Sequence, residues 1–194
     1  MQFPESMNPS FAPQATGWCL MVGLPSMNTG LLMAIARLPV PISAAQPAGL
    51  AGVRVLDGGS RFNAHSVARA ARGRPDILER ITVSRAFTCY QVLSLLESTP
   101  ATPATFVVID ILHTFYDESV QAGERERLLR ACIAELARLG RAASGLVSMY
   151  LPAIASTTAF ELLDLLHAAA TLSTVFIEKE PAPAKQPRQA RMGI

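Results

Sequence analysis

The chain has 194 residues, of which 50% are hydrophobic and 16% are charged, and its formal net charge at pH 7 is +2. These values indicate one domain that is large enough to bury a core without disulfides or metal ions, and they exclude extensive disorder away from the ends. The net charge neither requires nor excludes a nucleic-acid partner, because a local basic patch would suffice. The three cysteines, Cys19, Cys89 and Cys132, lack metal-ligand spacing, which predicts buried thiols in a reducing cytoplasm and no metal site.

The first quarter of the chain alternates between apolar runs and proline-rich stretches. Residues 1–16 predict a flexible arm, residues 18–23 a buried strand, residues 31–38 a short helix and residues 39–52 a connector. Prolines and glycines break this uncharged region into pieces shorter than the roughly 20 residues of a spanning helix. No basic residue precedes the apolar run, as a secretion signal would require. A cytoplasmic protein without a membrane partner is therefore expected.

The middle of the chain alternates strand and helix patterns. Asn63 stands where it can cap a helix that runs to about Arg72. A second helix is expected over residues 91–97, ended by prolines. Short runs rich in β-branched residues predict three buried strands, at residues 53–57, 81–85 and 105–110.

The last third continues the alternation. Apolar residues at helical spacing predict a long amphipathic helix over residues 124–139, with Gly140 as its C-cap. The remaining expected elements are a strand at residues 145–151, a helix at 158–169 and a strand at 171–178. The proline-rich, basic residues 180–194 predict a disordered tail, so the folded core is expected to span residues 17–179.

Alternating strands and helices predict an α/β fold, with a mostly parallel central sheet and helices on both faces. Asp57, Arg85 and Asp110 each close a predicted strand, and His113 follows three residues after Asp110. Carboxyl ends of parallel strands share one edge of the sheet, where ligands bind. These residues are therefore expected to form the edge of a site.

Four segments together resemble the core of the RecA/RadA recombinases and their KaiC-like relatives. Residues 55–62, Val-Leu-Asp-Gly-Gly-Ser-Arg-Phe, are similar to the second core strand and its turn. Residues 84–91, Ser-Arg-Ala-Phe-Thr-Cys-Tyr-Gln, resemble the next strand and helix start, residues 107–110 the Walker B strand, and residues 168–179 the last conserved strand. The resemblance covers residues 17–179 and implies a RecA-like three-layer sandwich.

The phosphate-binding loop departs from the pattern that the resemblance implies. In a Walker A loop, G-x-x-x-x-G-K-[ST], backbone amides cradle phosphates, the lysine neutralises them and the hydroxyl holds Mg²⁺. Leu31 and Leu32 stand where the lysine and the Ser or Thr should be. The residues predicted to be a vestige of a nucleotide site are Asn28, Thr29, Gly30 and Asp110.

Two further positions depart from the family. Gly59 stands where the recombinases place a water-orienting glutamate, and residues 149–151 stand where the family often places a glutamine that senses the γ-phosphate. Of the residues that the resemblance implies for ATP hydrolysis, Asp110 alone is present. Because the loss of one such group typically costs about 10²–10³ in rate, we expect no ATP hydrolysis and no cofactor.

The resemblance and its departures lead to three hypotheses. The first is a catalytically inactive RecA-like accessory protein that binds a recombinase or another repair factor, and DNA as well, in recombination or repair. The second is an ATPase that binds ATP and Mg²⁺ through a non-standard phosphate loop. The third is a scaffold, a homo-oligomer formed through the apolar residues 17–38.

Basic residues provide candidates for contact with nucleic acid. Residues 61–80 contain several arginines, but Asp76 and Glu79 reduce their net positive charge. A solvated face is therefore the ordinary alternative for this segment. The candidates are Arg61, Arg69, Arg72, Lys185, Arg188 and Arg191.

Overall fold

The computed structural model describes residues 16–38, 52–151 and 157–175. Six strands form one parallel sheet in the order β3-β2-β4-β5-β1-β6. This arrangement confirms the predicted α/β fold with a parallel central sheet. The strands are β1 (Gly17–Gly23), β2 (Val53–Asp57), β3 (Ile81–Arg85), β4 (Thr105–Ile109), β5 (Ser144–Tyr150) and β6 (Leu172–Val175).

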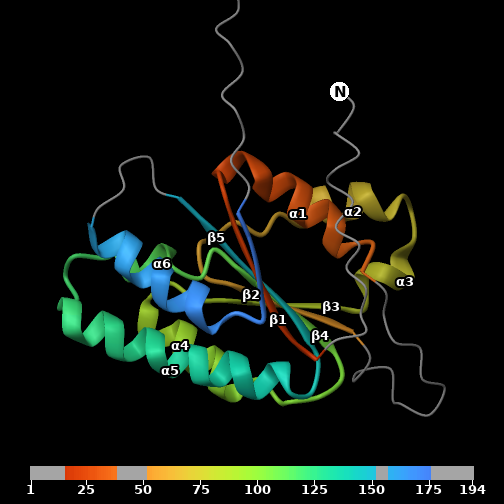
Figure 1. Ribbon diagram of the computed structural model, residues 1–194. Coiled ribbons are helices and arrows are strands. Elements are labelled where there is room, and N and C mark those ends of the chain that lie inside the picture. Colours follow the sequence, from red (N-terminus) through yellow and green to blue (C-terminus); the bar gives the residue numbers. More distant parts are fainter. Residues whose placement is uncertain (1–15, 39–51, 152–156, 176–194) are drawn as a thin grey trace, which may run out of the picture.

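Helices cover both faces of the sheet, which makes three layers (Figure 1). On one face lie α1 (Asn28–Ile35), α2 (Ala64–Ala71) and the short α3 (Pro75–Leu78). On the other face lie α4 (Cys89–Ser98), α5 (Ala122–Gly140) and α6 (Thr157–Ala169). Two 3₁₀ turns, η2 (Pro25–Met27) and η3 (His113–Tyr116), follow β1 and β4.

Each face of the sheet has its own hydrophobic core. Along β4, Val107 and Ile109 pack with the α1 and α2 side, whereas Phe106 and Val108 pack with the α4, α5 and α6 side. Every residue of β4 is buried. A strand covered on both faces reads as a continuous apolar run, which is why residues 105–109 give so clear a strand signal in the sequence.

The boundaries of several elements differ from those predicted. The predicted strands at residues 53–57 and 81–85 are confirmed, but the helix expected at 31–38 spans Asn28–Ile35 because η2 leads directly into it. Gly140 is not a left-handed C-cap: it lies inside α5, and the following Arg141 is right-handed. A Cβ on Gly140 would lie 3.2 Å from the Gly17 backbone, so this glycine permits close contact between helix and strand.

Several expectations concern parts of the chain outside the described residues. The arm predicted at 1–16, apart from residue 16, the connector at 39–52, apart from Gly52, and the tail at 180–194 lie there. Lys185, Arg188 and Arg191 of the tail lie there too. Within the described ranges, no helix is both long and apolar enough to cross a membrane.

Candidate functional site

The structure brings Asp57, Arg85 and Asp110 together at the carboxyl edge of the sheet. In the register of the parallel strands, Asp57 of β2 pairs with Arg85 of β3, and Asp110 directly follows β4. Arg85 Nε donates to Asp57 Oδ2 at 2.9 Å. His113, in η3, has its Nδ1 3.8 Å from Asp110 Oδ2, so all four residues predicted for this edge lie there.

Asp57 organises the turn that follows β2. Its carboxylate is fully buried and accepts the backbone amides of Arg61, at 2.9 Å, and Phe62, at 3.0 Å, in addition to the Arg85 guanidinium. Arg85 Nη2 also donates to the Phe62 carbonyl at 3.3 Å. The buried charge is thus both paired and hydrogen-bonded, and it folds residues 58–62 back over the sheet edge.

Asp110, the Walker B-like residue, is engaged by the chain's own donors. Its side chain is 2% exposed. Arg61 Nε donates to Oδ2 at 3.1 Å, and the Tyr150 amide donates to Oδ1 at 3.2 Å. Burial raises the pKa of Asp110, whereas the Tyr150 amide and the Arg61 guanidinium oppose that rise. The carboxylate therefore has an internal cation where a Walker B acid would face a metal ion.

Arg61 was predicted as a candidate for nucleic-acid contact, but the structure places it inside this network. Its guanidinium carbon lies 5.9 Å from the centre of the Tyr150 ring, within the range of a cation–π contact. Its side chain is 36% exposed. Arg69 and Arg72, at the end of α2, are exposed to solvent. Arg61 thus differs from the other two in being held by partners within the chain.

Gly59 leaves no room for a side chain. A Cβ at this position would lie 2.6 Å from Asp110 Oδ2 and 2.7 Å from Asp110 Cβ. Under the resemblance, a water-orienting glutamate belongs here. With Asp110 in its observed position, that glutamate would collide with it, so the loss of the acid and the placement of Asp110 are sterically linked.

The turn between β1 and α1 is short and filled by an apolar side chain. Met27 is 7% exposed, and a Cβ on Gly23 would lie 2.6 Å from its sulfur. Leu31 and Leu32 are buried in the core beneath α1. Met27 and the two leucines thus provide apolar groups where a phosphate loop would provide amides, a cation and a hydroxyl.

Asn28 ties this turn to the rest of the site. Its Nδ2 donates to the Arg61 carbonyl at 2.8 Å, and its Oδ1 accepts from the Tyr150 hydroxyl at 3.0 Å. Burial raises the pKa of that hydroxyl to about 12, so it stays protonated as a donor. Thr29 is exposed and Gly30 faces open space, so neither joins the network.

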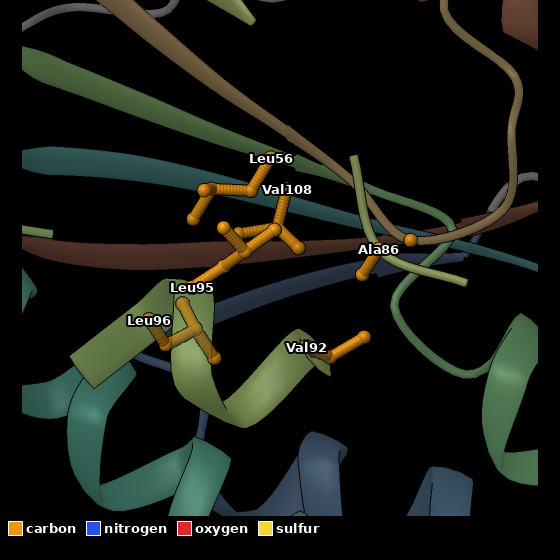
Figure 2. A pocket seen from close by; sticks show the side chains of 7 residues that line it. Leu56, Ala86, Val92, Leu95, Leu96 and Val108 are labelled. Carbon is orange, nitrogen blue, oxygen red and sulfur yellow. The ribbon is translucent and has the colours of Figure 1, made fainter. Parts of the chain in front are cut away.

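A small apolar cavity borders Gly58 and Ala86, the residues that follow Asp57 and Arg85. Figure 2 shows an apolar cavity between the sheet and α4, lined by Leu56, Val92 and Val108 among others, with a volume of about 10 Å³. This is the space of one water molecule. Over residues 16–38, 52–151 and 157–175, no three His, Cys, Asp or Glu side chains are placed to hold a metal ion.

Tyr150 and Arg61 are the members of this network that the sequence did not predict. Tyr150 directly ends β5, which was a usable signal, whereas the position of Arg61 depends on how the turn folds back. Comparisons with protein-family models and with curated proteins found no match to this chain. Because parallel α/β sheets serve many unrelated functions, the function has to be argued from the site.

Proposed function

We propose that this chain is a catalytically inactive RecA-like accessory protein that acts by binding a recombinase or another factor in DNA recombination or repair. The observation that carries the proposal is the internal neutralisation of Asp110 by Arg61. A P-loop ATPase keeps that acid available for Mg²⁺ and uses a loop lysine on the phosphates. Here the acid already has a cation, and Met27 fills the place of the loop.

The outer edge of the sheet supports a role in protein binding. β3 is outermost and, among the described residues, pairs with β2 alone. Val83 on β3 is 39% exposed, and Phe87 and Tyr90 just beyond it are 69% and 50% exposed. Unpaired strand edges with adjacent aromatic side chains accept extended segments of partner proteins by strand addition.

The exposed aromatic residues are held in place rather than loosely attached. The Phe87 amide donates to Gln91 Oε1 at 2.8 Å, and Thr88 caps α4 by accepting the Gln91 amide at 3.2 Å. The Ala86 amide donates to the Asp57 carbonyl at 2.9 Å. A rigid backbone lowers the entropy lost on binding, so this edge is suited to present Phe87 to a partner.

The test uses purified recombinase from the organism that encodes this chain and measures its binding by biolayer interferometry. We expect the double variant Phe87→Ala and Tyr90→Ala to weaken binding by at least about thirtyfold, as for aromatic hot spots. Phe160→Ala is the matched control, because Phe160 is 52% exposed on α6, which leads into β6 at the opposite edge of the sheet from β3. Equal loss in both variants, or no binding of any recombination or repair factor tested, would refute the proposal.

Calorimetry with ATP and Mg²⁺ tests the absence of a nucleotide site. We expect no binding heat at millimolar ATP. Micromolar binding abolished by Asp110→Ala would instead establish the second hypothesis, a nucleotide-binding enzyme.

The third hypothesis, a scaffold, requires residues 17–38 as a contact surface between copies. In the structure β1 lies between β5 and β6, and α1 packs into the core. A monodisperse monomer in sedimentation would exclude the scaffold hypothesis.

A further inference from the structure

The exposed aromatic edge formed by Phe87 and Tyr90 is joined to the buried Asp57 by a short series of contacts. Arg85 lies between them, because it ends β3 and Phe87 follows two residues later. Ala86 and Phe87 belong to neither β3 nor α4, so the regular hydrogen bonding of the sheet and the helix does not fix them. Their position depends on the individual contacts that hold this segment.

Asp57 holds the segment through both its backbone and its side chain. Its backbone carbonyl accepts the Ala86 amide at 2.9 Å. Its carboxylate accepts Arg85 Nε through Oδ2 at 2.9 Å, and the same oxygen accepts the Phe62 amide at 3.0 Å. Arg85 Nη2 reaches on to the Phe62 carbonyl at 3.3 Å. The guanidinium is thus held by two neighbouring acceptors, which fixes the direction in which the chain leaves β3.

Burial keeps the Asp57 side chain away from any partner protein. It is 0% exposed, whereas the Arg85 side chain is 39% exposed and Phe87 is 69% exposed. The carboxylate can therefore influence a bound protein only through the segment that it holds. Hydrogen bonds to a charged acceptor are roughly twice as strong as neutral ones, so this hold is strong for a single side chain.

We infer that Asp57 is a positioning residue for the aromatic edge, because through Arg85 it fixes Ala86 and Phe87 in the conformation that binds the partner. The Phe87 amide donates to Gln91 Oε1 at 2.8 Å, so the segment is tied to α4 as well as to the sheet. A segment fixed in advance loses less conformational entropy on binding, and freeing it lowers affinity. The effect on binding rests on the proposed function, whereas the effect on the free chain rests on the contacts alone.

The test compares Asp57→Asn with the wild-type chain by hydrogen exchange, measured for single amides by NMR. Asparagine replaces one acceptor oxygen by an NH₂ donor, so Arg85 Nε or a turn amide loses its acceptor. We expect the Ala86 amide to exchange at least about tenfold faster relative to the amide of Leu129, which is fully buried in α5. Arg85→Lys serves if Asp57→Asn does not fold, because lysine keeps the charge but cannot bond both acceptors at once.

Gly145→Ala is the matched control for a general loss of stability. Its Cβ would collide with the Phe106 ring, near the amino-terminal ends of β4 and β5, so it disturbs the sheet at the end opposite to Asp57. We expect this variant to leave the ratio of the Ala86 and Leu129 exchange rates almost unchanged.

Binding of purified recombinase, measured by biolayer interferometry, is the second readout. Asp57→Asn should weaken binding at least about tenfold, and Gly145→Ala should leave it almost unchanged. Equal acceleration of exchange at Ala86 and Leu129, or unchanged affinity despite a freed Ala86 amide, would overturn the inference. If no recombinase binds even the wild-type chain, the proposed function fails, and the exchange ratio still decides whether Asp57 fixes the edge.

Discussion

The ion pair between Arg61 and Asp110 should stabilise the fold. The substitution Arg61→Met tests this, because it removes the positive charge of the side chain and keeps most of the side chain's length. Losing one partner of a buried pair costs about 3–5 kcal/mol. Arg61 is 36% exposed, so solvent screens part of the attraction, and the Tyr150 amide still donates to the carboxylate. We therefore expect a loss of about 1–3 kcal/mol, or about 2–12 °C in Tm.

The loss should depend on pH, with a sign that follows from the buried carboxyl. The pKa of Asp110 in the folded protein lies above its ordinary value of 3.8, so the folded state binds this proton more tightly than the unfolded state. The stability contributed by this group therefore falls as pH rises above about 3.8. Without Arg61 that pKa rises further, so the variant should lose more stability at about pH 7 than at about pH 4.

Urea denaturation of both proteins at the two pH values measures these differences. Arg127→Met is the control, since Arg127 is 63% exposed in its pair with Glu124, and we expect it to leave the free energy of unfolding almost unchanged. Adding Asp110→Asn to Arg61→Met should restore part of the stability, because a neutral amide needs no counter-charge. A loss by Arg61→Met below about 0.5 kcal/mol, or one equal at both pH values, would refute the reasoning.

Three further predictions concern packing, capping and thiol chemistry. Gly145→Ala should cost about 1–3 kcal/mol by urea denaturation, because its Cβ collides with the Phe106 ring, and Phe106→Leu should relieve part of that cost. Asn63→Ala should cost about 1 kcal/mol in the same assay, because Asn63 Oδ1 caps α2 by accepting two backbone amides. Burial raises the pKa of Cys89, and that of Cys132 to about 12. Both thiols should react with iodoacetamide at about pH 8 at least about tenfold more slowly in the folded protein than in urea, as read by mass spectrometry; equal rates would contradict their burial.

Local sequence signals were sufficient to predict much of the sheet and the residues that meet at one edge of the site. Runs such as 53–57 are short, β-branched and followed by glycine, so the type and the bounds of the strand follow from the residues. Once the strands are parallel, their carboxyl ends must share an edge. The proximity of Asp57, Arg85 and Asp110 was therefore predictable without any knowledge of side-chain positions.

The remaining contacts of the site join residues that are distant in the sequence, so local patterns did not predict them. Asn28 and Tyr150, which share a hydrogen bond, are 122 residues apart in the chain. Arg61 reaches Asp110 because the turn after β2 folds back, with Ser60 at a positive φ of 54°. Nothing in the local pattern distinguishes such an arginine from a solvated one, so its contact with Asp110 was not predictable from the sequence.

The differences between this chain and the ATPase pattern that it resembles are physically linked rather than independent. A buried carboxylate such as Asp110 is costly without a nearby cation, and an ATPase supplies that cation with its bound metal and its loop lysine. In this chain Arg61 provides that positive charge itself, and Gly59 leaves the space in which Asp110 lies. Placing a lysine at Leu31 alone would therefore not create a phosphate site, because Met27 fills the turn and Arg61 already neutralises the acid.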